Sequence, residues 1–291
     1  MKSKKNLKYI ILAIALIVIA ISIVIISSMS KKNNQEQIAN MDVSIEYKEE
    51  EEDTNWKQSS YENIEISKSI TINKSGTYHL TGSIENGNIT INAGDEDLVR
   101  LVLDNVNITC NDSSAINVEN AKKVIIIVEE GTTNTFTDGT TYSTTDEPDA
   151  CLFSSDDLVI NGTGTLNINA NYLDGITSKD DLKIIGTTIN ITSNDDGVKG
   201  KDYVGIKNAN IKVNAKADGI KSTNDTETDK GYVVIENSNI NIEAKQDGIQ
   251  AETNIKIISG QFDIKTGGGS NNSSISSENW ENWGMRKRYD E

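Results

Sequence analysis

The chain has 291 residues, a formal net charge of −16 and a sequence pI near 4.6. Nucleic acids and anionic lipids bind basic surfaces, so this excess of acid argues against both as direct partners and is compatible with divalent cations. The chain has one histidine, His79, and two cysteines, Cys110 and Cys151. Cys/His catalysis and zinc sites are therefore not expected. The cysteines are either buried small apolar residues or a disulfide.

The N-terminal 30 residues carry a targeting signal. Four lysines, Lys2, Lys4, Lys5 and Lys8, precede an apolar run from Tyr9 to Ile26, which is long enough to span a bilayer as a helix. The lysines favour a cytoplasmic N-terminus, so the rest of the chain is expected outside the cell. An uncleaved membrane anchor is favoured, and the alternative is a signal peptide cleaved near Ser28–Ser30. Both predict export, either anchored with an extracellular domain or secreted, with membrane contact through this helix only.

The remaining chain falls into three parts. Residues 31–60 are polar and include the acidic run Glu49–Asp53, which indicates a solvated linker. Residues 61–269 show alternating apolar pairs separated by Gly, Asn, Asp and Ser, the pattern of short strands and turns. Within this part, residues 131–149 are Thr-rich and are predicted to form a protruding loop. Residues 270–291 are predicted to form a flexible Ser/Asn-rich tail, whose Trp280 and Trp283 are alternatively a cap on the last strands.

An Asp-Gly step followed by a β-branched residue occurs four times, at Asp174, Asp196, Asp218 and Asp247. The first three are 22 residues apart. The last interval is 29 and fits the same pattern once seven residues around Thr226 are looped out. The apolar positions repeat with the same spacing: Ile176, Leu182, Ile184, Ile189 and Ile191 recur as Val198, Val204, Ile206, Ile211 and Val213. This period predicts a solenoid of β-coils with about 22 residues per coil.

Coiling would stack equivalent residues at about 4.8 Å, so the aspartates become candidate metal ligands. The candidates are Asp156, Asp157, Asp174, Asp180, Asp181, Asp195, Asp196, Asp202, Asp218 and Asp247. Stacked carboxylates repel one another, and Ca²⁺ between coils would offset this repulsion with oxygen ligands. The alternative is that each Asp stabilises its own turn. Candidate ligand-binding residues beside the turns are Lys179, Lys199, Lys201 and Lys221, with Tyr172, Tyr203 and Tyr232 for stacking on sugar rings. The alternative for these lysines is that they are solubilising charges beside the aspartates.

Several segments resemble a family of exported bacterial carbohydrate-binding β-helix proteins. The resemblance covers roughly residues 64–270 and is carried by the segments at 103–110, 151–158, 172–182, 218–222, 230–232, 247–253 and 266–270. It implies a pectate-lyase-like fold, bound calcium and, from the characterised type, binding of cellulose and acidic pectic glycans. The expected fold class is therefore all-β, a right-handed single-stranded parallel β-helix. Family members often continue with further coils beyond the Gly-rich segment, whereas this chain ends soon after it.

Three functions compete. The first is a non-catalytic, calcium-dependent polysaccharide-binding protein of the cell envelope, for acidic or plant cell-wall glycans. The second is a calcium-dependent polysaccharide lyase, which needs a Lys or Arg as base; Arg100 is the only arginine among the predicted coils. The third is a structural or adhesive surface protein stiffened by calcium. The sequence predicts no oligomeric state.

Overall fold

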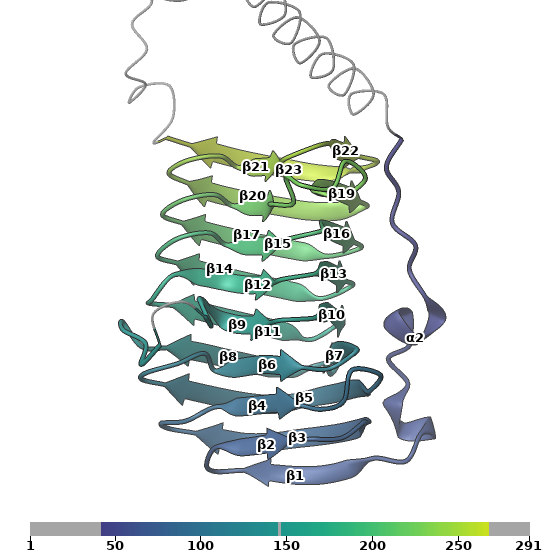
Figure 1. Cartoon of the computed structure of the whole chain (residues 1–291), viewed down its shortest axis with the longest axis vertical. Coiled ribbons are helices and arrows are strands. Elements are labelled where there is room, and N and C mark those ends of the chain that lie inside the picture. Colours follow the sequence, from purple (N-terminus) through teal and green to yellow (C-terminus); the bar gives the residue numbers. More distant parts are fainter. Residues whose placement is uncertain (1–41, 145–146, 268–291) are drawn as a thin grey trace, which may run out of the picture. The chain divides into compact units, whose positions relative to one another are not determined.

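The computed structural model describes residues 42–144 and 147–267 (Figure 1). The predictions for residues 1–30 and for the C-terminal tail lie outside these residues. The chain divides into two compact units, Met1–Asp42 and Val43–Glu291, and all but one of the described residues belong to the second. Among the described residues, no helix is long and apolar enough to span a bilayer.

The regular secondary structure of the described residues is parallel β-strand apart from a four-residue helix α2 (Glu49–Glu52) and a 3-10 turn η1 (Trp56–Gln58). Most layers of the stack contain three strands, which form three rows. Row 1 contains β7 (Lys123–Val128), β10 (Asp157–Gly162), β13 (Asp181–Ile185), β16 (Tyr203–Lys207), β19 (Tyr232–Glu236) and β22 (Ile255–Ile257). Row 2 contains β8 (Thr133–Asp138), β11 (Thr165–Ala170), β14 (Thr188–Ser193), β17 (Asn210–Ala215), β20 (Ser238–Ala244) and β23 (Gly260–Thr266).

Row 3 is a separate eight-stranded sheet. It contains β2 (Ile70–Ile72), β4 (Ile89–Asn92), β6 (Ile116–Asn120), β9 (Ala150–Ser154), β12 (Asp174–Ser178), β15 (Val198–Gly200), β18 (Ile220–Ser222) and β21 (Ile249–Ala251). Rows 1 and 2 belong to one 15-stranded sheet because the long strand β5 (Leu98–Cys110) pairs with both β7 and β8. The sheet continues through β3 (Gly76–Ile84) to β1 (Glu62–Ile66). The rows together form a nearly closed arrangement of parallel strands.

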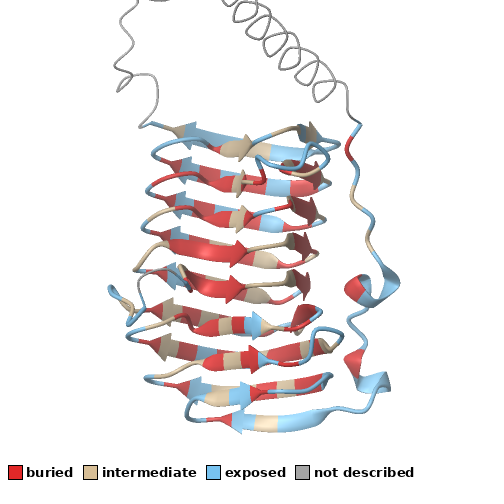
Figure 2. Cartoon of the chain, viewed as in Figure 1, coloured by how far each residue is buried: buried red, intermediate tan, exposed pale blue. Residues whose placement is uncertain are grey.

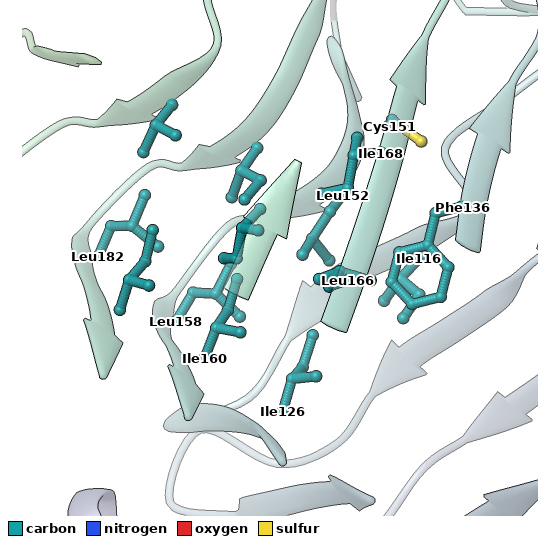
Figure 3. Packing of buried hydrophobic residues seen from close by; sticks show 14 of the residues in the cluster. Ile116, Ile126, Phe136, Cys151, Leu152, Leu158, Ile160, Leu166, Ile168 and Leu182 are labelled. Atoms are coloured by element: carbon teal, nitrogen blue, oxygen red, sulfur yellow. The ribbon is translucent and has the colours of Figure 1, made fainter. Parts of the chain in front are cut away.

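The pairing confirms the predicted register of apolar residues. In row 3, Ile176, Val198, Ile220 and Ile249 are neighbours on successive strands. The predicted positions in rows 1 and 2 also coincide, and the 29-residue repeat accommodates its extra residues between β18 and β19, at residues 223–231. The inward side chains form one continuous core between the rows; Leu158, Ile160, Leu166 and Leu182 are fully buried in it (Figure 3).

The structure corrects the predicted loop and decides between the two alternatives for the cysteines. Residues 133–138 are not part of a loop but form β8, whose Phe136 is fully buried in the core. The loop therefore begins after Asp138. Cys110 and Cys151 are both buried and are free thiols, so the interpretation as small apolar residues holds and no disulfide joins them.

Residues 43–58, which we call the N-terminal strap, cross the strands of row 1. Ile45 packs on Gly205 of β16, so closely that a Cβ on this glycine would lie 2.4 Å from Ile45 Cδ1. Trp56 forms a second apolar cluster with side chains of β5 (Leu98–Cys110) and row 1, namely Val102, Ile125, Ile127, Val159 and Ile185. Buried positions in the strap are visible in Figure 2. The prediction of a solvated linker is therefore wrong for this part of residues 31–60.

Charged groups also fix the strap. Glu51 is fully buried and forms ion pairs with Lys123 and Lys183, the latter at 2.7 Å. Lys183 donates a second hydrogen bond, of 2.8 Å, to the carbonyl oxygen of Glu46. Residues of the acidic run thus pair with lysines that are far away in sequence. Because these lysines are not part of the local sequence, the run by itself has the composition of a solvated segment.

Candidate functional site

The Asp-Gly steps stack at the corner before row 3. Asp174, Asp196 and Asp218 are buried, whereas Asp247 in the last layer is exposed. In each of the three buried residues, Oδ1 accepts a hydrogen bond from the backbone N–H of the next Asp in the column, at 2.8–2.9 Å. The carboxylates therefore satisfy backbone donors between layers, as the turn-stabilising alternative requires.

Two of the predicted lysines neutralise this column. Lys199 pairs with Asp174 and, at 3.0 Å, with Asp149, while Lys221 lies 2.7 Å from Asp218 and 3.6 Å from Asp196. Burial raises the pKa of Asp174 to about 6 against the opposing effect of Lys199. The charge of the column is thus offset within the protein, and the repulsion that suggested calcium here does not require an ion.

The other predicted lysines and Asp195 lie nearby without joining the column. Lys179 pairs with Glu147, and Lys201 is exposed. Asp195 is half-buried, and burial followed by repulsion from Asp196 raises its pKa.

A second group of carboxylates lies at the corner before row 1. Asp157, Asp180 and Asp181 are half-buried and each offers an oxygen within 4.8 Å of the others. Burial and the neighbouring Asp202 raise the pKa of Asp180 to about 7, while burial raises the pKa of Asp181 to about 6. We call these three residues the acid cluster.

Two predicted metal ligands at the same corner are occupied by other partners. Asp156 accepts a hydrogen bond of 2.9 Å from the backbone N–H of Ala121. Asp202 pairs with Lys230 at 2.8 Å and accepts from the Asn224 side chain at 2.6 Å. Negative charge is therefore concentrated on the acid cluster, where Asp157 lies 3.7 Å from Lys123 and the charge of Lys183 acts on Asp181 without offsetting its burial.

The predicted tyrosines stack on protein rings. Tyr203 and Tyr232 are neighbours in row 1, with ring centroids 5.3 Å apart and planes at 14°. Tyr172 stacks in the same way on Tyr142, at 4.2 Å and 21°. Burial, followed by repulsion from Asp181, raises the pKa of Tyr203, which is hydrogen-bonded to that carboxylate. These rings thus have partners within the protein.

The outer face of row 2, which we call the polar face, was not among the predicted sites. Its outward side chains form three columns along the stack: Thr133, Thr165, Thr188, Asn210, Asn239 and Gln261; Thr135, Asn167, Asn190, Lys212, Asn241 and Asp263; and Thr137, Asn169, Thr192, Asn214, Glu243 and Lys265. Amides bond along the columns, as in Asn190 to Asn167 at 2.9 Å. The signal was present in the sequence as Thr or Asn between the apolar residues of each repeat.

Two adjoining hollows, of about 370 and 510 Å³, open on the polar face. Both are lined by Asn190 and Lys212. The face thus combines amide and hydroxyl groups, which can donate and accept hydrogen bonds, with the ammonium group of Lys212 at its centre and the charged Glu243, Asp263 and Lys265 in the last layers. Such a surface suits a ligand rich in hydroxyl groups.

The described residues combine stacked parallel strands, a repetitive polar face and a cluster of carboxylates. A family model described as "Carbohydrate-binding domain-containing protein" matches residues 67–285, and the chain belongs to this family. A protein of the same description from Acetivibrio thermocellus is 39% identical over 128 residues, which are 43% of this chain and 45% of that protein. The chain thus matches about half the length of this relative.

A solved structure is also similar. It is titled the polysaccharide lyase-like protein from C. thermocellum, gadolinium derivative, and it has 30% sequence identity and a TM-score of 0.58. The similarity covers 71% of this chain and 96% of that one. The chain is therefore a carbohydrate-binding domain protein with a polysaccharide lyase-like fold.

Proposed function

We propose that this protein is a non-catalytic, calcium-dependent polysaccharide-binding protein of the cell envelope. Its rows would be the three faces of a right-handed single-stranded parallel β-helix, as the 22-residue register between β12, β15 and β18 supports. The N-terminal apolar run would export the chain and hold it at the membrane. The observation that carries the proposal is the polar face, considered together with membership of a carbohydrate-binding family.

The polar face fits a glycan chain for two physical reasons. Its amides and hydroxyls repeat at the strand spacing of about 4.8 Å, so neighbouring sugars of one chain can meet equivalent groups. Lys212 lies in both hollows and offers a positive charge to a uronate carboxylate. An acidic glycan such as polygalacturonate could thus bind a protein whose net charge is −16.

Substitution of the polar face tests this proposal. We expect Lys212→Ala to reduce retention on polygalacturonate at least about tenfold, because a charge-assisted contact contributes about 1.5–3 kcal/mol and tenfold corresponds to about 1.4 kcal/mol, and Asn190→Ala to reduce it by less. The exposed Lys216 follows β17 outside the hollows, so Lys216→Ala is the matched control. Equal binding by the two lysine variants would exclude the polar face as the glycan site.

The acid cluster is the proposed calcium site. Asp157, Asp180 and Asp181 supply carboxylate oxygens, the ligands that Ca²⁺ prefers, on adjacent layers. The similar solved structure is a gadolinium derivative, and Gd³⁺ is, like Ca²⁺, a hard cation suited to oxygen ligands. Bound calcium would offset the charge that remains unpaired in this corner and would rigidify two layers.

Calcium titration followed by a thermal scan tests the site. We expect Ca²⁺ to raise the melting temperature of the wild type, since a ligand that binds only the folded state stabilises it. Asp180→Asn with Asp181→Asn should abolish this rise, whereas Asp195→Asn should retain it. If chelator removes calcium and leaves glycan retention unchanged, binding does not depend on calcium even though the metal site exists.

A lyase is the second candidate because the solved neighbour is called lyase-like. Lyase chemistry needs a basic side chain beside the metal. Near the acid cluster, Lys183 is engaged by Glu51 and by the carbonyl of Glu46, and Lys230 by Asp202. This pairing favours binding over catalysis. Release of unsaturated, ultraviolet-absorbing products from polygalacturonate would reverse that preference.

A further inference from the structure

A mixed cluster of one imidazole and two carboxylates lies at the other end of the stack from the 29-residue repeat. His79 is on β3, Asp104 is on β5 and Glu129 follows β7, so three successive layers each contribute one residue. One ligand atom from each lies within 4.8 Å of the other two. The acid cluster lies on other strands, β10 and β13, and shares none of these residues.

The imidazole ring is held in one orientation. It stacks on Trp56 of the N-terminal strap, with centroids 4.6 Å apart and planes at 17°, and Tyr61 meets it edge-on. Nδ1 lies 2.9 Å from Asn63 Oδ1; because a carbonyl oxygen accepts, this contact favours the tautomer with the proton on Nδ1. This tautomer leaves the lone pair of Nε2 unprotonated and directed at the carboxylates.

Nε2 is buried and has no hydrogen-bond partner among the described residues, although the side chain as a whole is 16% exposed. It lies 3.4 Å from Asp104 Oδ2 and 3.6 Å from Glu129 Oε2. These distances exceed a normal hydrogen bond. They match the ligand-to-ligand spacing of a tetrahedral zinc site, about 3.3–3.4 Å for metal–ligand bonds of about 2.0–2.1 Å.

Each of the three side chains is also held through its other polar atom. Asn63 binds Nδ1 of His79, Asn105 donates to Asp104 Oδ1 at 2.9 Å, and Lys57 donates to Glu129 Oε1 at 2.8 Å. Outer partners of this kind orient the ligands of protein metal sites. The oxygens left over, Oδ2 and Oε2, are the two that face Nε2.

We propose that His79, Asp104 and Glu129 bind a divalent transition-metal ion, for which Zn²⁺ is the natural choice. An imidazole nitrogen with two carboxylates suits Zn²⁺ better than Ca²⁺, which prefers oxygen throughout. Three protein ligands leave a fourth position for water, and Glu129 borders a hollow of about 360 Å³ that also contacts Trp56 and Lys57. The ion joins three layers at the point where the N-terminal strap is docked. This inference does not depend on carbohydrate binding.

The single histidine makes the test specific. In the full chain labelled with ¹⁵N-histidine, one imidazole reports the site. In calcium-containing buffer, we expect one equivalent of Zn²⁺ to shift the Nε2 resonance strongly while Nδ1 stays protonated. Asp104→Asn should weaken Zn²⁺ binding by more than tenfold, since even losing an outer partner costs about 10–100-fold.

Two controls separate metal binding from loss of structure. Asp104→Asn leaves the imidazole stacked on Trp56, so its calcium response should remain intact. Glu119→Gln changes an exposed carboxylate on row 3 and should bind Zn²⁺ as the wild type does. If Zn²⁺ leaves the Nε2 resonance unchanged, or if Asp104→Asn binds it with wild-type affinity, the proposal is wrong and the cluster is an imidazolium–carboxylate ion pair.

Discussion

At the scale of single residues, Glu51 shows how a charged side chain can hold a surface segment in place. It belongs to the N-terminal strap, is completely buried, and contacts two ammonium groups, those of Lys123 and Lys183. One of its carboxylate oxygens also accepts the backbone N–H of Lys48 at 3.0 Å. The carboxylate therefore compensates two lysines whose side chains are themselves almost fully buried.

We expect Glu51→Gln to lower the free energy of unfolding by about 3–5 kcal/mol, because it removes the close counter-charge of two buried ammonium groups and leaves Lys123 only Asp157, 3.7 Å away. Denaturant titration measures this loss. Glu50→Gln, at an exposed neighbouring position, is the control and should change stability by less than about 0.5 kcal/mol. A loss of similar size in both variants would show that the net charge of the acidic run, rather than the buried pairing, stabilises the protein.

The same residue predicts a pH dependence. Burial acts to raise the pKa of Glu51, but the hydrogen bonds from Lys123 and Lys183 outweigh it and the pKa is lowered. A carboxyl group with a lowered folded-state pKa stabilises the protein above its unfolded-state pKa of about 4.3, and this stabilisation is lost as the pH falls through the folded-state value. The stability difference between wild type and Glu51→Gln should thus be constant above about pH 5 and should narrow on acidification. A difference that widens in acid would contradict this assignment.

At the scale of elements, the Asp-Gly turns need glycine because successive layers approach closely. A Cβ on Gly197 would lie 2.6 Å from the carbonyl oxygen of Gly219 and 2.4 Å from a methyl carbon of Val213. A Cβ on Gly175 or Gly219 would likewise lie 2.5 Å from the carbonyl oxygen of the glycine in the next layer. The glycine therefore gives the neighbouring backbone room, while the Asp before it accepts that backbone's N–H.

We expect Gly197→Ala to destabilise the protein by about 1–3 kcal/mol, the usual cost of overpacking, because neither backbone nor core can move aside. Gly94→Ala is the matched control, since the nearest atom there is the flexible Asp97 side chain at 3.1 Å. Thermal and chemical unfolding of both variants provide the measurement. If the two substitutions cost the same, close approach of the layers is not the reason for the glycine column.

At the scale of the whole described stack, burial decreases in the last layer. Ile235 and Ile257 are neighbours in the same column, yet Ile235 is fully buried and Ile257 is 50% exposed. Ile255, Ile258 and Ile264 are similarly exposed. The last described layer thus has neighbouring strands on one side and little cover on the other.

Alanine scanning of this column should show the gradient. We expect Ile235→Ala to cost about 2–5 kcal/mol, as for a buried isoleucine, and Ile257→Ala to cost less than half as much. Chemical unfolding of the full chain gives both values. Equal losses would mean that another part of the protein or a partner covers the last layer in solution.

The repeat could be predicted from sequence because it depends on local spacing. Residues such as Ile184 and Ile206 recur at a fixed interval, and parallel pairing converts that interval directly into register. The strand positions and the core therefore follow from the sequence pattern alone. The Thr-rich composition of residues 133–138 is typical of a loop, and Phe136 is the one large apolar side chain of this segment that enters the core. A single apolar residue gives no alternating pattern, so the strand is not predicted.

The partners of the charged groups could not be predicted in the same way. Lys199 and Asp174, or Lys183 and Glu51, are 25 and 132 residues apart, and only the assembled stack determines which charges meet. The sequence spacing therefore predicts a column of aspartates, but it does not predict the lysines and backbone N–H groups that bind their carboxylates. The grouping of Asp157, Asp180 and Asp181 follows from stacking, whereas the meeting of His79 with Asp104 and Glu129 has no sequence signature.

The direction of the N-terminal strap has a mechanical consequence. From Ile45 beside β16 to Trp56 beside β3, the strap passes down the layers in the order opposite to that in which the later chain builds them. Tension applied to the backbone before residue 43 would reach the contact of Ile45 with Gly205 first and the Glu51 ion pairs next. The strap would detach contact by contact and absorb extension before any force reached β1 and the strand ladder. Single-molecule pulling should show this as a low-force event that precedes rupture of the sheets.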